Sequence, residues 1–197
     1  MKPSNLIISL LLGVMILLGS CGRRAKLTKS EVDSLKAEYV SLLAPADTAW
    51  KIMMDEDDEK LFYLKRLLQE VSYTNEYDTI QYTSLMTRLE ELKVIRYDQY
   101  TVSDSKLIDK YDSVTIQLVP EILNFASSHP MFGNYPLMAE LIYNIRELDN
   151  NVLFKRADYD REAKKLNEYL THNEDALADN LPDLDRNKKP LFEIPAE

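Results

Sequence analysis

Residues 136–170 read PLMAELIYNIRELDNNVLFKRADYDREAKKLNEYL, and this stretch indicates the fold class most clearly. Its apolar side chains recur every three or four residues, which is the spacing that places them on one face of an α-helix. The proline stands at the start, where its missing N–H costs a helix nothing. A helix of about 40 residues starting here would be about 60 Å long. The apolar stripe consists of Leu137, Leu141, Ile145, Leu148, Val152, Tyr159, Ala163, Leu166 and Leu170.

The segment after residue 27 shows the same helical spacing. Thr28 and Glu31 fit a capping box, in which each side chain bonds an otherwise free backbone N–H at the start of a helix. We expect this first helix to end or kink at Pro45, because proline lacks the N–H that a helix interior needs. A second helix should then start near Ala46 and continue to about Val71.

Two more helices are expected between the polar turn at residues 73–79 and the last helix. The third covers about residues 79–99. The fourth can be capped by Ser103 or Asp104, and Pro120 should kink it.

These elements predict an all-α protein. Residues 28–180 should form an antiparallel up-and-down bundle of about four long helices, because short connections make consecutive helices antiparallel neighbours. The chain contains only four glycines, which is typical of helical proteins. Residues 181–197 contain three prolines and are expected to form an extended C-terminal tail.

The N-terminus has the features of a bacterial lipoprotein signal peptide. Lys2 gives it a short positive start, and residues 6–18 are almost wholly apolar. This apolar run is shorter than the roughly 20 residues that a membrane-spanning helix needs. Two small residues precede Cys21, the only cysteine in the chain, and this arrangement resembles a lipobox.

The signal predicts where the protein resides. Residues 1–20 should be removed, and Cys21 should carry the lipid that ties the chain to a membrane, followed by a linker over residues 21–27. The alternative is an uncleaved N-terminal anchor with an incidental thiol. Residues 22–26 are basic rather than acidic, which favours the periplasmic face of the cell envelope over the cell surface.

The charge of the chain argues against nucleic acid as a partner. Removal of residues 1–20 takes away Lys2 and no acid, so the formal net charge of −9 becomes −10. Nucleic-acid binding requires a basic surface, which this composition does not provide.

Few side chains suggest chemistry. The acidic run Asp55–Glu59 has no nearby turn glycine of the kind that calcium loops use, so we expect a solvated helix face. His172 follows Glu168 by four residues, but zinc needs three or four ligands. His129 is expected to be a turn residue. The chain has no glycine-rich phosphate loop and no serine elbow, so we predict no catalytic residue, no metal site and no cofactor.

Tyrosine is abundant, with twelve residues in the chain. Such side chains either cap a core with the hydroxyl in water or form an aromatic surface of the kind that interfaces favour. Six of them gather in the middle of the sequence: Tyr73, Tyr77, Tyr82, Tyr97, Tyr100 and Tyr111.

The last helix and the tail resemble the LemA family over roughly residues 130–197, and residues 46–72 match it poorly. Asp160 stands where the family has Asn, and Leu166 where it has Tyr. The residues that carry the resemblance are Ala49-Trp50, Tyr135-Pro-x-x-Ala139, Arg156-x-x-Tyr159-Asp160, Leu166-Asn167 and Lys189-Pro-Leu-Phe192-Glu193.

The resemblance implies an antiparallel helical bundle outside the cytoplasm with no established catalytic site. We therefore expect a non-enzymatic protein that binds or scaffolds other envelope proteins. The alternatives are a bundle that binds a small ligand or peptide between its helices, and an envelope hydrolase. Arg156 and Asp160 are spaced to form a surface ion pair. The candidate partner-contact patch is Tyr135, Arg156, Tyr159 and Asp160.

Overall fold

A computed structural model describes residues 27–192, and within these residues the protein is all-α, without a strand. This confirms the predicted fold class. The predicted signal peptide and Cys21 lie outside the described residues. The elements are α2 (Lys29–Ser72), α3 (Thr79–Val94), α4 (Ser105–Ser127), the 3-10 turn η1 (Phe132–Asn134), α5 (Pro136–His172) and α6 (Glu174–Asn180).

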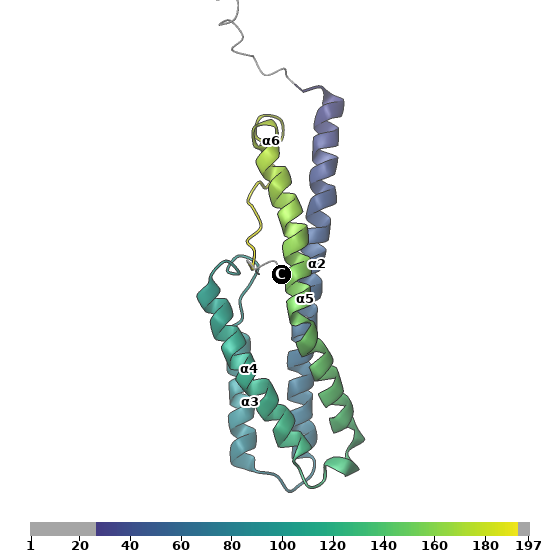
Figure 1. Cartoon of the computed structure of the whole chain (residues 1–197), viewed down its shortest axis with the longest axis vertical. Helices are drawn as coiled ribbons and strands as arrows, with labels where there is room; N and C mark the ends of the chain where they lie inside the picture. Colours follow the sequence, from purple (N-terminus) through teal and green to yellow (C-terminus); the bar gives the residue numbers. More distant parts are fainter. Residues whose placement is uncertain (1–26, 193–197) are drawn as a thin grey trace, which may run out of the picture.

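The helices α2 to α5 alternate in direction along the molecule, as predicted for an up-and-down bundle (Figure 1). The two longest, α2 and α5, lie antiparallel and make the most extensive contact between any two elements. In the lower half of Figure 1, α3 and α4 pack against them to complete a four-helix bundle. In the upper half α2 and α5 continue as a two-helix arm, with α6 at its end.

Each half has its own hydrophobic core. The bundle core takes residues from all four helices, and Leu64, Leu89, Leu118 and Ile145 are fully buried in it. A smaller arm core joins the N-terminal part of α2 to the C-terminal part of α5 and to α6. Its buried members are Tyr39, Leu166, Tyr169, Leu170 and Leu177.

The prediction that a second helix starts near Ala46 was wrong. The helix α2 runs through Pro45 without a break. Pro45 is exposed, so the backbone carbonyl that loses its partner one turn earlier can be hydrated instead, whereas the next residue, Ala46, is fully buried. Packing against α5 on both sides of this position outweighs the local cost of the proline.

The predicted third helix was too long at its C-terminal end. Helix α3 ends at Val94 rather than Gln99. The side chain of Asp98 accepts hydrogen bonds from the backbone N–H groups of Tyr100 and Thr101, each at 2.9 Å. Such an Asx turn offers the backbone an alternative to the helix.

The helix starts agree with the predicted caps. Thr28 and Glu31 form the capping box, with the Thr28 backbone N–H donating to the Glu31 carboxylate at 2.7 Å. Asp104, rather than Ser103, caps α4 through the backbone N–H of Lys106. No helix among residues 27–192 is both long enough and apolar enough to cross a membrane.

His129 lies in the turn where it was expected, but it is buried and bridges two turns. Its Nδ1 accepts a hydrogen bond of 3.1 Å from the backbone N–H of Met131. The other ring nitrogen lies 2.6 Å from the carbonyl oxygen of Glu76 and 3.1 Å from the hydroxyl of Thr74. The imidazole therefore links the start of η1 to the turn between α2 and α3.

Candidate functional site

Four of the seven buried polar or charged residues of the described chain lie near the point where the arm leaves the four-helix bundle, and we call this region the junction: they are Lys60, Thr115, Arg156 and Asp160. There the segment of residues 95–104 and the C-terminal tail, drawn in yellow, reach the α2–α5 pair (Figure 1). Elements that are distant in sequence thus converge on a short length of two helices.

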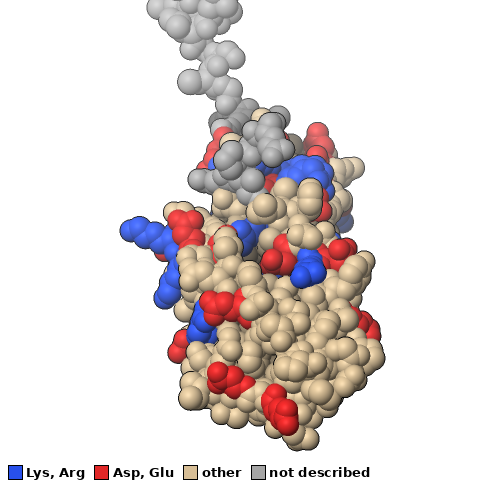
Figure 2. Space-filling view, turned by 60° about the horizontal axis from the view of Figure 1, so that its bottom comes forward, with Lys and Arg blue, Asp and Glu red and all other residues tan. Residues whose placement is uncertain are grey.

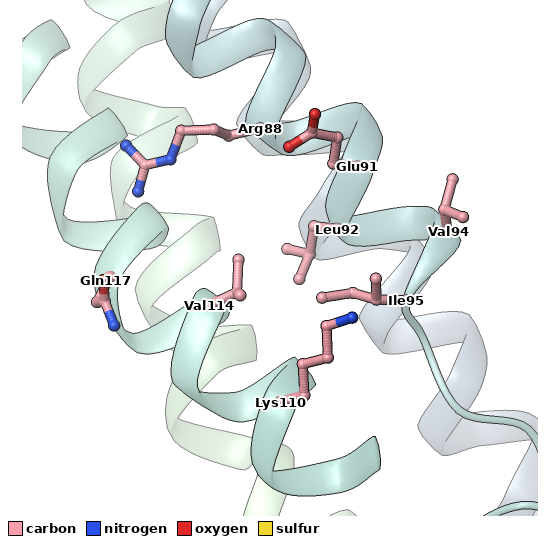
Figure 3. Close-up of a pocket in the computed structure, with 8 residues that line it drawn as sticks. All are labelled: Arg88, Glu91, Leu92, Val94, Ile95, Lys110, Val114 and Gln117. Atoms are coloured by element: carbon pink, nitrogen blue, oxygen red, sulfur yellow. The ribbon is translucent and has the colours of Figure 1, made fainter. Parts of the chain in front are cut away.

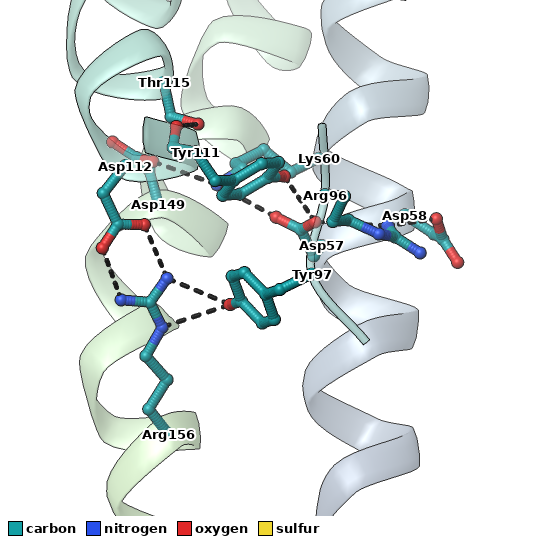
Figure 4. A network of polar contacts seen from close by, with 10 residues as sticks. All are labelled: Asp57, Asp58, Lys60, Arg96, Tyr97, Tyr111, Asp112, Thr115, Asp149 and Arg156. Carbon is teal, nitrogen blue, oxygen red and sulfur yellow. Dashed lines mark hydrogen bonds and ion pairs between the residues drawn. The ribbon is translucent and has the colours of Figure 1, made fainter. Parts of the chain in front are cut away.

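Arg156 occupies the middle of the junction. It is 5% exposed and its guanidinium makes a bidentate ion pair with Asp112 of α4, with N–O distances of 2.7 and 2.6 Å (Figure 4). The same guanidinium donates to the hydroxyl of Tyr97 at 3.0 and 3.3 Å. This planar, two-pronged geometry suits arginine and not lysine.

A second group of charges lies on the α2 side of the junction (Figure 4). Asp57 accepts a hydrogen bond of 2.6 Å from the Tyr111 hydroxyl and forms ion pairs with Arg96 and Lys60, at 3.2 and 3.3 Å. Lys60 is itself buried and bridges to Asp149 of α5 at 3.3 Å. Asp57 was predicted to lie on a solvated face. This was wrong, because Tyr111, Arg96 and Lys60 bond its carboxylate, which is largely buried.

Burial and charge shift the titration of these groups. Burial alone lowers the pKa of Arg156, but the hydrogen bonds and charges of Asp112 and Tyr97 hold that pKa above its ordinary value. Burial, followed by the negative charge of Asp57, raises the pKa of Tyr111 well above the ordinary range. Arg156 therefore stays charged and Tyr111 stays neutral, so the junction is a set of fixed charge pairs.

An aromatic cage stands next to Arg156. Phe192 of the tail stacks on Trp50 at a ring-centroid distance of 6.3 Å and an interplanar angle of 20°. Its ring also makes edge contacts with Tyr97 and Tyr159, at 5.4 and 6.0 Å. The Arg156 guanidinium carbon lies 5.0 Å from the Phe192 ring centroid, within the range of a cation–π interaction.

Helix α5 also holds the main chain of the tail. The side-chain amide of Asn167 both donates to the carbonyl of Lys189 and accepts from its N–H, each at 2.8 Å. The Tyr159 hydroxyl donates to the carbonyl of Pro190, and the Phe192 N–H donates to Oδ1 of Asp160, each at 2.9 Å. The predicted tail is therefore extended along α5, and it also contacts Asp47 and Trp50 of α2; we call the surface formed by these contacts the groove.

The structure brings together most of the residues that carried the family resemblance. Arg156, Tyr159 and Asp160 all lie in the junction, but they are buried and do not form an open surface patch. Arg156 pairs with Asp112 instead of Asp160, so the predicted surface pair was wrong. Tyr135 lies at the other end of the bundle, where its hydroxyl donates to the carbonyl of Tyr73 at 3.3 Å.

Several junction residues had no recognisable signal in the sequence. Asp112 and Tyr97 lie 44 and 59 positions from Arg156, and no motif links them. The helical stripe gave one indication, because Asp57 occupied a position where an apolar residue was expected. A charged residue at a core position indicates that partners arrive from another element.

His172, which was considered as a metal ligand, bonds the C-terminal end of helix α5. Its Nδ1 lies 2.7 Å from the carbonyl oxygen of Glu168, so the ring bonds the last turn of α5 rather than the Glu168 carboxylate. Among the described residues, no group of three or more His, Cys, Asp or Glu side chains is arranged to hold a metal ion.

A hollow lies between α3 and α4 (Figure 3). It has a volume of about 510 Å³ and an apolar floor of Leu92, Ile95 and Val114. Lys110 stands at its edge (Figure 3). Arg88, which also lines it, is engaged by Glu121 of α4.

The end of the bundle opposite the arm has a largely uncharged surface. Figure 2 looks toward this end and shows scattered acidic side chains, with the visible Lys and Arg side chains mostly toward the upper part of the view. Exposed apolar residues of the turns and helix starts at this end include Tyr73 and Ile80.

The fold and the junction define a helical bundle whose own C-terminal tail is seated on its longest helix pair. Comparison of the chain with protein-family models, curated proteins and solved structures finds no match. The resemblance to the LemA family therefore stays a prediction.

The first prediction concerns the Arg156–Asp112 pair. Asp112→Asn keeps the size of the side chain and leaves the Arg156 charge buried without a counter-ion, so the free energy of unfolding should fall by about 3 kcal/mol. Urea unfolding followed by circular dichroism measures the change. Asp158→Asn is the matched control, because it removes an exposed partner of Arg161 on the same helix and should cost about 0.5 kcal/mol or less. Equal effects of the two substitutions would contradict the assignment.

The second prediction concerns alkaline pH. Burial raises the pKa of Tyr159 to about 12, whereas an unfolded chain releases this proton near the ordinary value of about 10. Below about pH 10 the Tyr159 phenol is neutral in both the folded and the unfolded chain, so it contributes no pH dependence to stability. Above about pH 10 the unfolded chain loses this proton first, so the free energy of unfolding falls. Urea unfolding between about pH 9 and about pH 11 should show a shallower decline for Tyr159→Phe than for the natural chain. Tyr100→Phe, at a tyrosine that is 86% exposed, is the control and should leave the decline unchanged. Equal declines for all three chains would refute the prediction.

Proposed function

We propose that this is a bacterial lipoprotein, tied to the cell envelope by a lipid on Cys21, whose LemA-like helical bundle binds or scaffolds other envelope proteins. The observation that carries the location is the apolar run that ends at the only cysteine of the chain. The basic residues 22–26 favour the periplasmic face. The proposed role is structural recognition and not catalysis.

Two features of the molecule support a binding role. Two acids of the junction are engaged in ion pairs, since Asp57 and Asp112 each bond a buried or half-buried cation. They are therefore poorly placed to transfer protons to a substrate. In contrast, Phe62, Leu153 and Phe154 on α2 and α5 expose between 62% and 70% of their surface, which provides apolar contacts for a partner.

A small ligand bound between helices is the second candidate function. The hollow between α3 and α4 favours it, because an apolar floor with Lys110 at the edge suits a small apolar anion. By contrast, the space between α2 and α5 near Met53 and Leu148 has a volume of only about 10 Å³, so this part of the helix pair leaves no room for such a ligand.

The third prediction tests the anchor and the partner in the same cells. Cys21→Ser should abolish lipid labelling and leave the precursor unprocessed, because the thiol is the acylated group. Labelling with a fatty-acid analogue followed by gel analysis measures both, and a retained label would refute the lipoprotein assignment.

In the anchored natural form, a photo-crosslinking amino acid at position 154 should capture a reproducible envelope protein.

The matched control places the same crosslinker at position 171, which is exposed on the polar surface of the same helix. The proposal expects capture at position 154 and little at position 171. Repeated failure to capture any envelope protein at position 154, with the anchor intact, would count against the binding role.

A further inference from the structure

We propose that the groove that holds the tail is a binding site for an extended peptide of a partner protein, with a basic residue, a proline and an aromatic residue spaced as Lys189, Pro190 and Phe192 are. The chain's own tail occupies this site as an internal ligand. The proposal rests on the binding role proposed above and identifies the site and the chemistry of the partner segment.

The first support is the register between the helix and the tail. Asn167 and Asp160 are seven residues apart on α5, which corresponds to about 10.5 Å along a helix axis. The tail residues that they bind, Lys189 and Phe192, are three residues apart, and an extended chain covers about 10 Å over that interval. Two side chains of α5 thus match the repeat of an extended peptide that runs antiparallel to the helix.

This contact recognises backbone more than sequence. Asn167 bonds both main-chain groups of Lys189, Tyr159 bonds the carbonyl of Pro190, and Asp160 bonds the N–H of Phe192. Every extended peptide presents the same carbonyls, and the carbonyl used at position 190 is one that proline retains. Recognition of an extended backbone with separate pockets for side chains is a recurrent mode of peptide binding.

The side-chain requirements come from two points of the groove. Phe192 enters the cage of Trp50, Tyr97 and Tyr159, where its ring contacts all three rings and the Arg156 guanidinium. At the other end Lys189 forms an ion pair of 2.8 Å with Asp47 of α2. A partner segment therefore needs a cation three residues before an aromatic side chain.

The tail leaves part of the groove unsatisfied. Asp160 is 3% exposed, and while its Oδ1 accepts from the Phe192 N–H, its Oδ2 is buried and has no hydrogen-bond partner among the described residues. Unpaired buried polar atoms are rare in native proteins because they cost free energy. A peptide that brings a further donor to Asp160 gains an interaction that the described part of the tail, up to Phe192, does not make.

Among the described tail residues, only Phe192 packs against the bundle core, so displacement of the tail removes one side chain from the edge of that core. Between α6 and Lys189 the segment of residues 182–188 is exposed except at Leu184, so its displacement breaks few contacts. The tethered tail competes with a free peptide for the groove at an effective concentration of about 1 mM. A free peptide therefore binds the natural chain far more weakly than it binds a chain whose tail has lost its anchor. The aromatic ring of Phe192 is that anchor.

The experiment uses the full mature chain and its single tryptophan, Trp50, as the reporter. The probe is a synthetic peptide with the sequence of residues 185–192, DRNKKPLF, and an amidated C-terminus. Phe192→Ala should shift Trp50 emission to longer wavelength, because the stacked ring is replaced by water. Addition of the peptide should reverse this shift with saturation, and the apparent Kd should be at least about tenfold lower than for the natural chain.

Three controls fix the interpretation. A peptide with Ala in place of its Phe should not reverse the shift, and Asp47→Asn in the Phe192→Ala background should weaken the peptide several-fold. Leu191→Ala is the matched tail variant, because Leu191 is absent from the aromatic cage, and it should leave Trp50 emission unchanged. Circular dichroism and gel filtration show whether each variant is folded and monomeric.

These outcomes test the peptide-site proposal independently of the lipid anchor on Cys21. If the peptide does not saturably restore Trp50 emission of a folded Phe192→Ala chain, or restores it equally well without its Phe, the groove is not a peptide site and the proposal is overturned. If Phe192→Ala does not fold, Phe192→Leu is used instead, because it removes the ring from Trp50 and keeps an apolar side chain in its place, and the same comparison of peptides applies. Reciprocal insertion of tails between two copies would appear as a dimer of the natural chain and would also overturn the choice of a partner peptide. None of these results changes the expected outcome of the Cys21 and crosslinking tests.

Discussion

The buried charge of Arg156 is the constraint on which the junction depends. A guanidinium removed from water must keep a counter-ion and its hydrogen bonds, and Asp112 and Tyr97 supply them from α4 and the 95–104 segment. Its face also lies over Phe192 of the tail. One side chain of α5 therefore fixes the positions of α4, the 95–104 segment and the tail along the helix pair.

The same constraint explains the contrast between the two halves of the molecule. In the bundle, four helices surround an extensive apolar core. The arm has only two long helices and a small core, so it carries side chains that bond backbone groups elsewhere. Tyr39 and Tyr169 are examples, with hydroxyls that donate to the carbonyls of Asp185 and Leu35 at 2.9 and 2.6 Å. These bonds hold the tail and the helix pair where apolar burial alone is limited.

The sequence was sufficient for the class of fold and for the long last helix, because apolar periodicity is a local property. It was not sufficient at Pro45, where packing along α5 overrides the local preference of proline to end a helix. The candidate patch was only partly predictable. Arg156, Tyr159 and Asp160 were predicted to form a partner-contact patch and do lie in one region, but they are buried. Their burial and partners such as Asp112 depend on which elements meet in space, and no spacing along the chain encodes that. The tyrosines in the middle of the sequence also differ in burial: Tyr97 and Tyr111 are buried in the junction, whereas Tyr100 is exposed.

The central claim is that the tail is seated on α5 and that Arg156 holds it there. Hydrogen exchange of individual backbone amides, measured by NMR on the natural chain and on Arg156→Lys, tests it most directly. The account predicts that the amides of Lys189 and Phe192 are protected in the natural chain, because Asn167 and Asp160 accept from them. Both should lose at least about tenfold of that protection in Arg156→Lys, which keeps the charge but not the bidentate pair. Exchange of these two amides at the rate of a free peptide in the natural chain would contradict the account.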